Sequence, residues 1–108
     1  MKEQDEKINA LRKGLLELAV LNVISVKEVY VADLLQALAT TEFRTQEGTL
    51  YPLLSKLRRE GALKYEWVES EQGPPRKYYS LTPQGKQTLA ELTQYFKKIH
   101  ETITKLGK

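Results

Sequence analysis

The fold of this chain is decided by residues 45–82, TQEGTLYPLLSKLRREGALKYEWVESEQGPPRKYYSLT, because the hydrophobic pattern changes period within them. Leucines at helical spacing predict a helix over residues 45–60, which Gly61 ends as a left-handed cap. Apolar and polar residues then alternate over residues 63–68 and again over 76–81, which predicts two short strands. A glycine- and proline-rich segment joins the strands, so the sequence predicts a helix followed by a β-hairpin.

One residue of the predicted helix is unusual. Pro52 has no amide hydrogen, and its ring crowds the carbonyl group four residues back, which belongs to Gly48. We therefore expect the first turn of this helix to be loose near Gly48.

Two further helices are predicted upstream. Apolar residues recur at helical spacing from Ile8, and over residues 15–26 they cover nearly the whole circumference. A helix that is apolar all round is buried on both sides, and in so small a protein one side should face a second subunit. A shorter helix over residues 30–40 follows, and the polar residues 41–44 connect it to the helix at 45–60.

A long last helix is predicted after the hairpin, with Thr82 as its N-cap and Pro83 at its first position. Its apolar residues recur at alternating spacings of three and four, and we call them the tail seam: Leu89, Leu92, Phe96, Ile99, Ile103 and Leu106. Burying one such side chain contributes roughly 1.5–3 kcal/mol. The tail seam should therefore pair, either with its symmetry mate or with the first helix of another subunit, and make a homodimer.

Together these elements predict a mainly α protein with a small β-hairpin (α+β). The order of three helices and a hairpin is that of a winged helix-turn-helix. We expect a winged helix-turn-helix domain over residues 1–81, whose first helix contributes to the dimer, and a C-terminal dimerisation helix over residues 82–108.

Composition excludes several classes of protein. The 108 residues include one histidine and no cysteine, and every glycine is isolated, so we expect no enzyme, no metal site and no cofactor. The N-terminal residues lack the apolar stretch of a signal peptide, and residues 15–26 are too short and too polar to span a bilayer. These features predict a cytoplasmic protein.

Charge is distributed unevenly along the chain. The net charge of +3 divides into −2 for residues 1–54 and +5 for residues 55–108. A basic second half suits a polyanion, although a solvated lysine-rich face explains the charge alone better. In a winged helix-turn-helix, the helix before the hairpin enters the major groove of double-stranded DNA and the hairpin, or wing, lies along the backbone. Charge and fold together therefore point to DNA.

The predicted DNA contacts are polar and basic side chains of residues 45–60 and of the wing: Thr45, Gln46, Thr49, Tyr51, Ser55, Lys56, Arg59, Arg76 and Lys77. Taken singly, each of the helix residues is better explained as solvated surface, and for Arg76 and Lys77 the two explanations are equally good. Glu47 would repel phosphate unless it reads a cytosine amino group. We expect the four aromatic residues of the hairpin, Tyr65, Trp67, Tyr78 and Tyr79, mostly to form its core rather than to stack on bases.

Two motifs in these segments resemble the PadR family of transcriptional regulators. The first is GTLYPLL at 48–54, followed by Lys56-Leu57 and Glu60-Gly61; the second is Glu69-Ser70 leading to GPPRKYY at 73–79, then Leu81-Thr82 and Gly85. The resemblance implies a homodimeric repressor of an inverted-repeat, palindromic operator. It also implies that Thr49, Tyr51, Arg76 and Lys77 contact DNA, and the single C-terminal helix resembles a small subfamily.

One position departs from the family pattern. Many members carry glycine and then an aromatic residue in the second helix, where this chain has Val31-Ala32. A phosphate contact from that aromatic residue is therefore not expected here.

The resemblance further implies a flat aromatic effector between the first and last helices, near Leu11, Leu15, Leu18, Leu92 and Phe96. A plain dimer core explains these residues better. Two alternative functions stay open: a winged-helix adaptor that binds protein without an operator, and a drug-binding sensor that hardly binds DNA.

Overall fold

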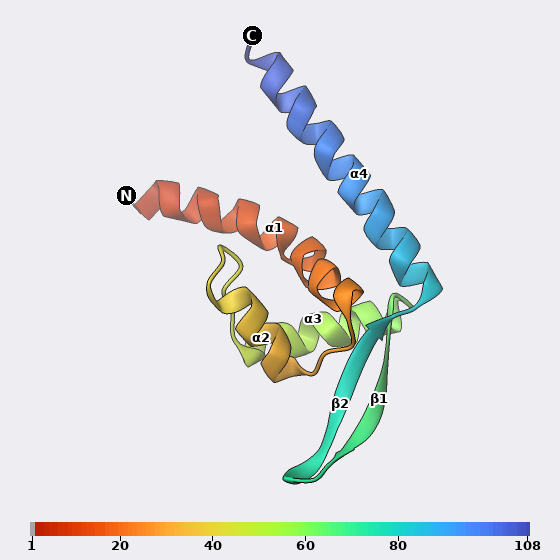
Figure 1. Ribbon diagram of the computed structural model, residues 1–108. Helices are drawn as coiled ribbons and strands as arrows, with labels where there is room; N and C mark the ends of the chain where they lie inside the picture. The colour runs from red at the N-terminus through yellow and green to blue at the C-terminus, as the bar shows by residue number, and fades with distance from the viewer. Residues whose placement is uncertain (1) are drawn as a thin grey trace.

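The fold was analysed in a computed structural model, which describes residues 2–108 (Figure 1). The described elements, in order, are α1 (Lys2–Val26), α2 (Val31–Ala39), α3 (Glu47–Arg59), β1 (Leu63–Ser70), β2 (Gly73–Leu81) and α4 (Pro83–Leu106). The strands form one antiparallel two-stranded sheet. In Figure 1 this hairpin projects to one side of the three N-terminal helices, and α4 leaves on the other side. The predicted α+β winged helix-turn-helix with a long last helix is confirmed.

The core lies between the first three helices and the base of the hairpin. Leu50, Leu54 and Leu57 of α3 are completely or almost completely buried, which confirms the face predicted from leucine spacing. Of the two sides predicted to be buried over residues 15–26, one is covered within the chain. Val20, Leu21 and Ile24 are buried, but residues 15 and 18 are half-buried and Val26 is 82% exposed. One side of α1 is therefore left without a covering layer within the described chain.

The hairpin differs from its sequence prediction at the tip. Residues 73–75 were expected in the turn, but β2 already begins at Gly73 and only residues 71 and 72 make the turn. Ser70 pairs with Gly73 and Val68 with Arg76, and the register shifts between these two pairs. Proline lacks an amide hydrogen but fits an extended strand at such an irregularity. The wing is therefore longer than predicted.

The base of the wing is attached to the α1–α2 connection. Val29 and Tyr79 exchange two backbone hydrogen bonds, with N–O distances of 3.1 and 2.8 Å. The Tyr79 side chain is 5% exposed, and its burial raises the pKa of the phenol above its ordinary value, so the group stays protonated and neutral. The orientation of the wing relative to α3 is thus set by buried contacts.

Two predicted helix ends are confirmed: the end of α3 at Gly61 and the start of α4 after Thr82. Gly61 has a φ of +86° directly after α3, the left-handed conformation expected of a C-terminal cap. The Thr82 hydroxyl accepts a hydrogen bond of 2.9 Å from the amide of Gly85 and donates one of 2.6 Å to the carbonyl of Gly61. One threonine therefore connects the end of α3 to the start of α4.

The first turn of α3 begins two residues later than predicted, at Glu47 after the N-cap Gln46. The carbonyl of Gln46 accepts hydrogen bonds from the amides of both Thr49 and Leu50, at 3.0 and 3.1 Å. The helix continues through Pro52, which lies exposed at the surface. The irregularity expected near Gly48 is thus limited to the carbonyl of Gln46, which accepts hydrogen bonds from two amides. Pro52 removes one amide donor from the helix.

Candidate nucleic-acid interface

The exposed face of α3 lies opposite its buried leucines. With about 100° between successive residues of a helix, Ser55 and Arg59 fall at the centre of this face together with Pro52. Tyr51, which is 47% exposed, lies at its edge toward the wing, and Thr49 lies at its edge toward α1. Predicted DNA-contact residues thus occupy the centre and both edges of one helical face.

A hollow of about 340 Å³ separates the start of α2, the start of α3 and the wing. Its lining includes three of the predicted DNA-contact residues, Tyr51, Arg76 and Lys77. Glu47, whose negative charge argued against DNA binding, lines the same hollow as these two cations. The tertiary structure therefore brings the start of α3 and the basic part of the wing together.

Aromatic rings hold the cations of the wing. The Arg76 guanidinium lies over the Tyr30 ring at 4.6 Å from its centroid, and the Lys77 ammonium lies 4.4 Å from the Tyr65 centroid and 5.4 Å from that of Trp67. Each such contact contributes roughly 0.5–1 kcal/mol at an exposed site. The cations are therefore oriented before any ligand arrives, while their charge stays accessible.

These contacts correct the prediction for one hairpin aromatic residue. Tyr79 is a core residue as expected, but Trp67 is 64% exposed and lies beside Lys77. The alternation of strand residues places Trp67 on the same face as Tyr65, but at this point the strand borders the open hollow beside the starts of α2 and α3 and is not covered by them. Only the base of the wing is close enough to the core to be covered.

The α1 side of α3 holds the remaining candidates. Lys56 is turned toward α1, with its ammonium 3.6 Å from the carboxylate of Glu17 and 3.9 Å from that of Glu60. Thr45 and Thr49 line a small hollow with Arg12 and Arg44. Lys56 is thus separated from the other predicted contacts by its orientation.

Four residues of this interface were missed by sequence reasoning: Tyr30, Arg58, Arg12 and Arg44. The Arg58 guanidinium lies over the ring of Tyr65 in the wing, 4.9 Å from the ring centroid. Arg58 lies within the predicted helix and the other three lie outside it and the wing, but none of them gives a local signal, because its role depends on which element packs against it.

The tail seam and the predicted effector residues meet between α1 and α4. Leu15, Leu18 and Phe96 line two adjacent hollows of about 360 and 190 Å³, and Leu92 and Ile99 line the smaller one. The lining of neither hollow includes Leu11, which is 69% exposed. Four of the five predicted effector residues thus lie around these two hollows, and Leu11 does not.

The exposure of the tail seam increases along α4. Leu89 packs against the core of its own domain, Phe96 is 38% exposed, and Leu106 is 80% exposed. The seam therefore changes from a core element at the start of α4 to an open apolar face at its end.

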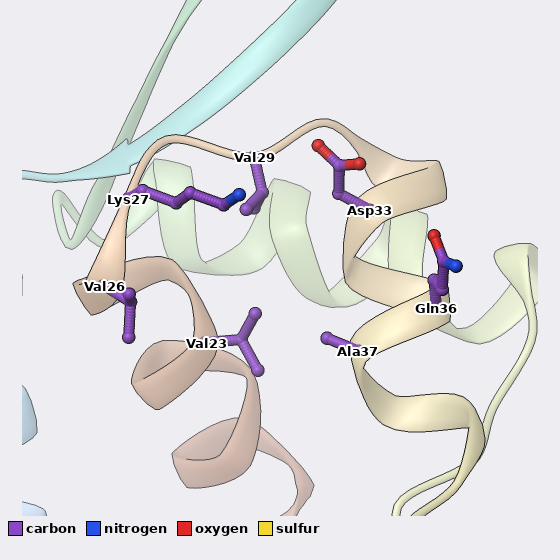
Figure 2. A pocket seen from close by; sticks show the side chains of 7 residues that line it. All are labelled: Val23, Val26, Lys27, Val29, Asp33, Gln36 and Ala37. Atoms are coloured by element: carbon purple, nitrogen blue, oxygen red, sulfur yellow. The ribbon is translucent and has the colours of Figure 1, made fainter.

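A further hollow, of about 470 Å³, lies between the end of α1 and α2 (Figure 2). Figure 2 shows Val23 and Ala37 pointing toward one another across it, with the polar groups of Asp33 and Gln36 on the α2 side. Lys27 is the one basic residue of its lining. It lacks the clustered cations of the hollows beside α3.

Within residues 2–108, no helix combines the length and the apolar content that crossing a membrane requires.

Comparison with known proteins places this chain in a family. Residues 20–91 match the transcriptional regulator PadR-like family. A curated relative, the transcriptional regulator Rv3488 of Mycobacterium tuberculosis, is 34% identical over 80 residues, covering 74% of this chain and 74% of its own. An uncharacterised protein X of Lysinibacillus sphaericus is 28% identical over 94 residues, covering 84% of this chain and 86% of its own.

Solved structures agree. A PadR-like transcription factor from Bacteroides fragilis is 43% identical, with a TM-score of 0.80 and coverage of 91% of this chain and 95% of its own. A PadR family transcriptional regulator from Eggerthella lenta is 30% identical, with a TM-score of 0.90 and coverage of 97% and 92%. The chain therefore belongs to the PadR-like family of transcriptional regulators, which are DNA-binding proteins and not enzymes.

Proposed function

We propose that this protein is a homodimeric repressor that binds an inverted-repeat operator with α3 in the major groove and the wing on the backbone. The observation that carries the proposal is the hollow in which Tyr51 of α3 lies beside Arg76 and Lys77 of the wing. Base-reading and phosphate-binding side chains are then presented on one surface, as an operator requires. The proposal also places the protein in the cytoplasm, together with its DNA.

The dimer is supported by the open part of the tail seam. Ile103 and Leu106 are 67% and 80% exposed, although they continue the heptad spacing of residues that are half-buried. Covering them with the tail or the first helix of a second copy would remove this apolar surface from water. A two-fold dimer would then present two α3 helices about one DNA turn, roughly 34 Å, apart.

The effector belongs to the same proposal. A flat aromatic compound in the hollow of about 360 Å³ would contact Phe96 of α4 and Leu15 and Leu18 of α1. It would release DNA only if it binds one spacing of the two α3 helices more tightly than the other. Without such a compound, the same residues serve as plain dimer core.

Tyr51→Ala and Arg76→Ala test the contacts directly. We expect each to weaken binding to DNA from upstream of the protein's own gene about tenfold or more, because a hydrogen bond to a charged group contributes roughly 1.5–3 kcal/mol. The dimer should remain intact, since neither residue belongs to the tail seam. The measurement is a gel shift at several salt concentrations with unrelated competitor DNA.

The matched control is Lys98→Ala, which removes a charge from an exposed position of α4 outside the tail seam. Wild-type affinity in both Tyr51→Ala and Arg76→Ala at moderate salt would show that the contacts are assigned wrongly. A wild-type protein without any salt-dependent preference for palindromic duplex would instead support the protein-binding adaptor.

Tyr30→Leu tests whether the ring orients Arg76. We expect operator affinity to fall about threefold, because the leucine keeps apolar bulk but loses the ring face below the guanidinium. Tyr30→Phe keeps the ring and should restore wild-type affinity. In an Arg76→Ala background, Tyr30→Leu should have no further effect in the same gel shift; an equal loss in both backgrounds would contradict the orienting role.

A further inference from the structure

A second group of basic residues lies on the other side of α3 from the wing. We call it the α1-side notch, and it consists of Asn9, Arg12, Lys13, Arg44, Thr45 and Thr49 around a hollow of about 170 Å³. A water molecule occupies about 30 Å³ in the liquid, so this hollow can hold a group the size of a phosphate. The two threonines were predicted DNA contacts, whereas the three cations come from elements to which no DNA contact was assigned.

The backbone segments that carry the notch residues belong to packed or hydrogen-bonded local structure. Arg12 and Lys13 follow Asn9 by three and four residues, so all three lie on one side of α1, and Leu16 continues that side into the core. The loop that carries Arg44 is closed by a hydrogen bond of 3.0 Å from the Phe43 amide to the Thr41 hydroxyl. Both sides of the notch are therefore held in place by packed elements.

The charge of the notch is uncompensated. Its lining contains no acidic residue, and within residues 2–108 none of its three cations lies within 4.0 Å of a carboxylate. Lys56, about two helical turns beyond Thr49, shows the contrast because it has two carboxylate neighbours. Like charges that share a small hollow repel one another, and a bound anion would relieve that repulsion.

The position of the notch beside α3 indicates that the anion is a phosphate of the DNA backbone. An α-helix with its side chains is about 10–12 Å across and the major groove is about 12 Å wide, so a helix in the groove has a phosphate backbone on each side. Arg76 and Lys77 lie beside the Tyr51 edge of α3, and Arg12, Lys13 and Arg44 lie beside the Thr49 edge.

We propose that the α1-side notch binds a backbone phosphate on the strand opposite the one that the wing contacts. The proposal rests on the proposed operator binding, and it assigns to α1 a role in DNA binding besides its part in the dimer. The phosphate contacts on the two sides would fix the depth and the tilt of α3 in the groove.

The double variant Arg12→Gln/Arg44→Gln tests the notch. Each protomer would lose one phosphate contact, so a dimer would lose two. The slope of log affinity against log salt concentration should become shallower by about two, since each contact contributes roughly 0.9. Affinity for operator and for unrelated duplex should fall by the same factor, about tenfold or more at moderate salt, because a phosphate contact carries no sequence information.

The matched control is Lys98→Gln/Lys105→Gln, which removes the same charge from exposed positions of α4 outside the tail seam. It should keep the wild-type salt slope. Arg44→Gln alone should give part of the effect, and because Arg44 lies outside α1 and α4, this variant should keep the proposed dimer.

Operators with single uncharged methylphosphonate linkages locate the contact. In the wild type, one substitution on the strand away from the wing should weaken binding, and the double variant should be insensitive to that same substitution. An unchanged salt slope, or equal sensitivity of both proteins to every substitution, would overturn the notch while leaving operator binding in place. A wild type that binds no duplex would overturn the proposed function itself.

Discussion

Gly85→Ala should lower the free energy of unfolding by about 3 kcal/mol, at the upper end of the range for overpacked cores. Gly85 is buried at the start of α4, and a Cβ atom at this position would overlap the carbonyl oxygen of Ala62. That carbonyl cannot move away easily, because it accepts a hydrogen bond of 3.0 Å from the Thr82 amide. The measurement is urea unfolding at fixed protein concentration, with the midpoint and the slope compared.

Gly48→Ala is the control for this prediction. A Cβ atom at Gly48 would meet nothing within 4 Å, and alanine is favoured over glycine inside a helix by roughly 0.5–1 kcal/mol. This variant should unfold at the wild-type urea concentration or slightly above it. If Gly85→Ala unfolds at the same midpoint as Gly48→Ala, the close approach of α4 to Ala62 is not a constraint on the fold.

Phe96→Asp should convert the protein to monomers at micromolar concentration and weaken operator binding more than a hundredfold. By two-fold symmetry, a dimer would bring two such carboxylates into an apolar interface, and each buried unpaired charge costs several kcal/mol. The monomer should stay folded, since Phe96 is outside the buried core. Sedimentation velocity measures the assembly, circular dichroism the fold, and a gel shift the DNA affinity.

The control, Gln94→Asp, places the same carboxylate at an exposed position of α4 outside the tail seam. It should remain dimeric and bind operator as the wild type does. A Phe96→Asp protein that still sediments as a dimer would show that the tail seam is not the interface. A monomer with wild-type operator affinity would show that the two half-sites are not read together.

The order of the elements, the end of α3 and the start of α4 follow from the sequence alone. Leucine spacing on α3, the glycine after it and the Thr82-Pro83 start of α4 each act within about one helical turn, so the sequence predicts them correctly. The hairpin was also predictable from alternation. Its tip was not, because the two prolines are compatible with both a turn and an irregular edge strand.

Which side chains meet around α3 was decided only by tertiary structure. Arg12 and Arg44 are 32 positions apart, and Tyr30 and Arg76 are 46 apart, yet each pair shares one hollow. Residues 1–54 are acidic overall, so their composition gives no sign that Arg12 and Arg44 line one basic hollow. Periodicity specifies which face of a helix is buried, but the packing of one helix on another decides which exposed edges become neighbours. Long-range contacts of this kind carry no local pattern from which they could be predicted.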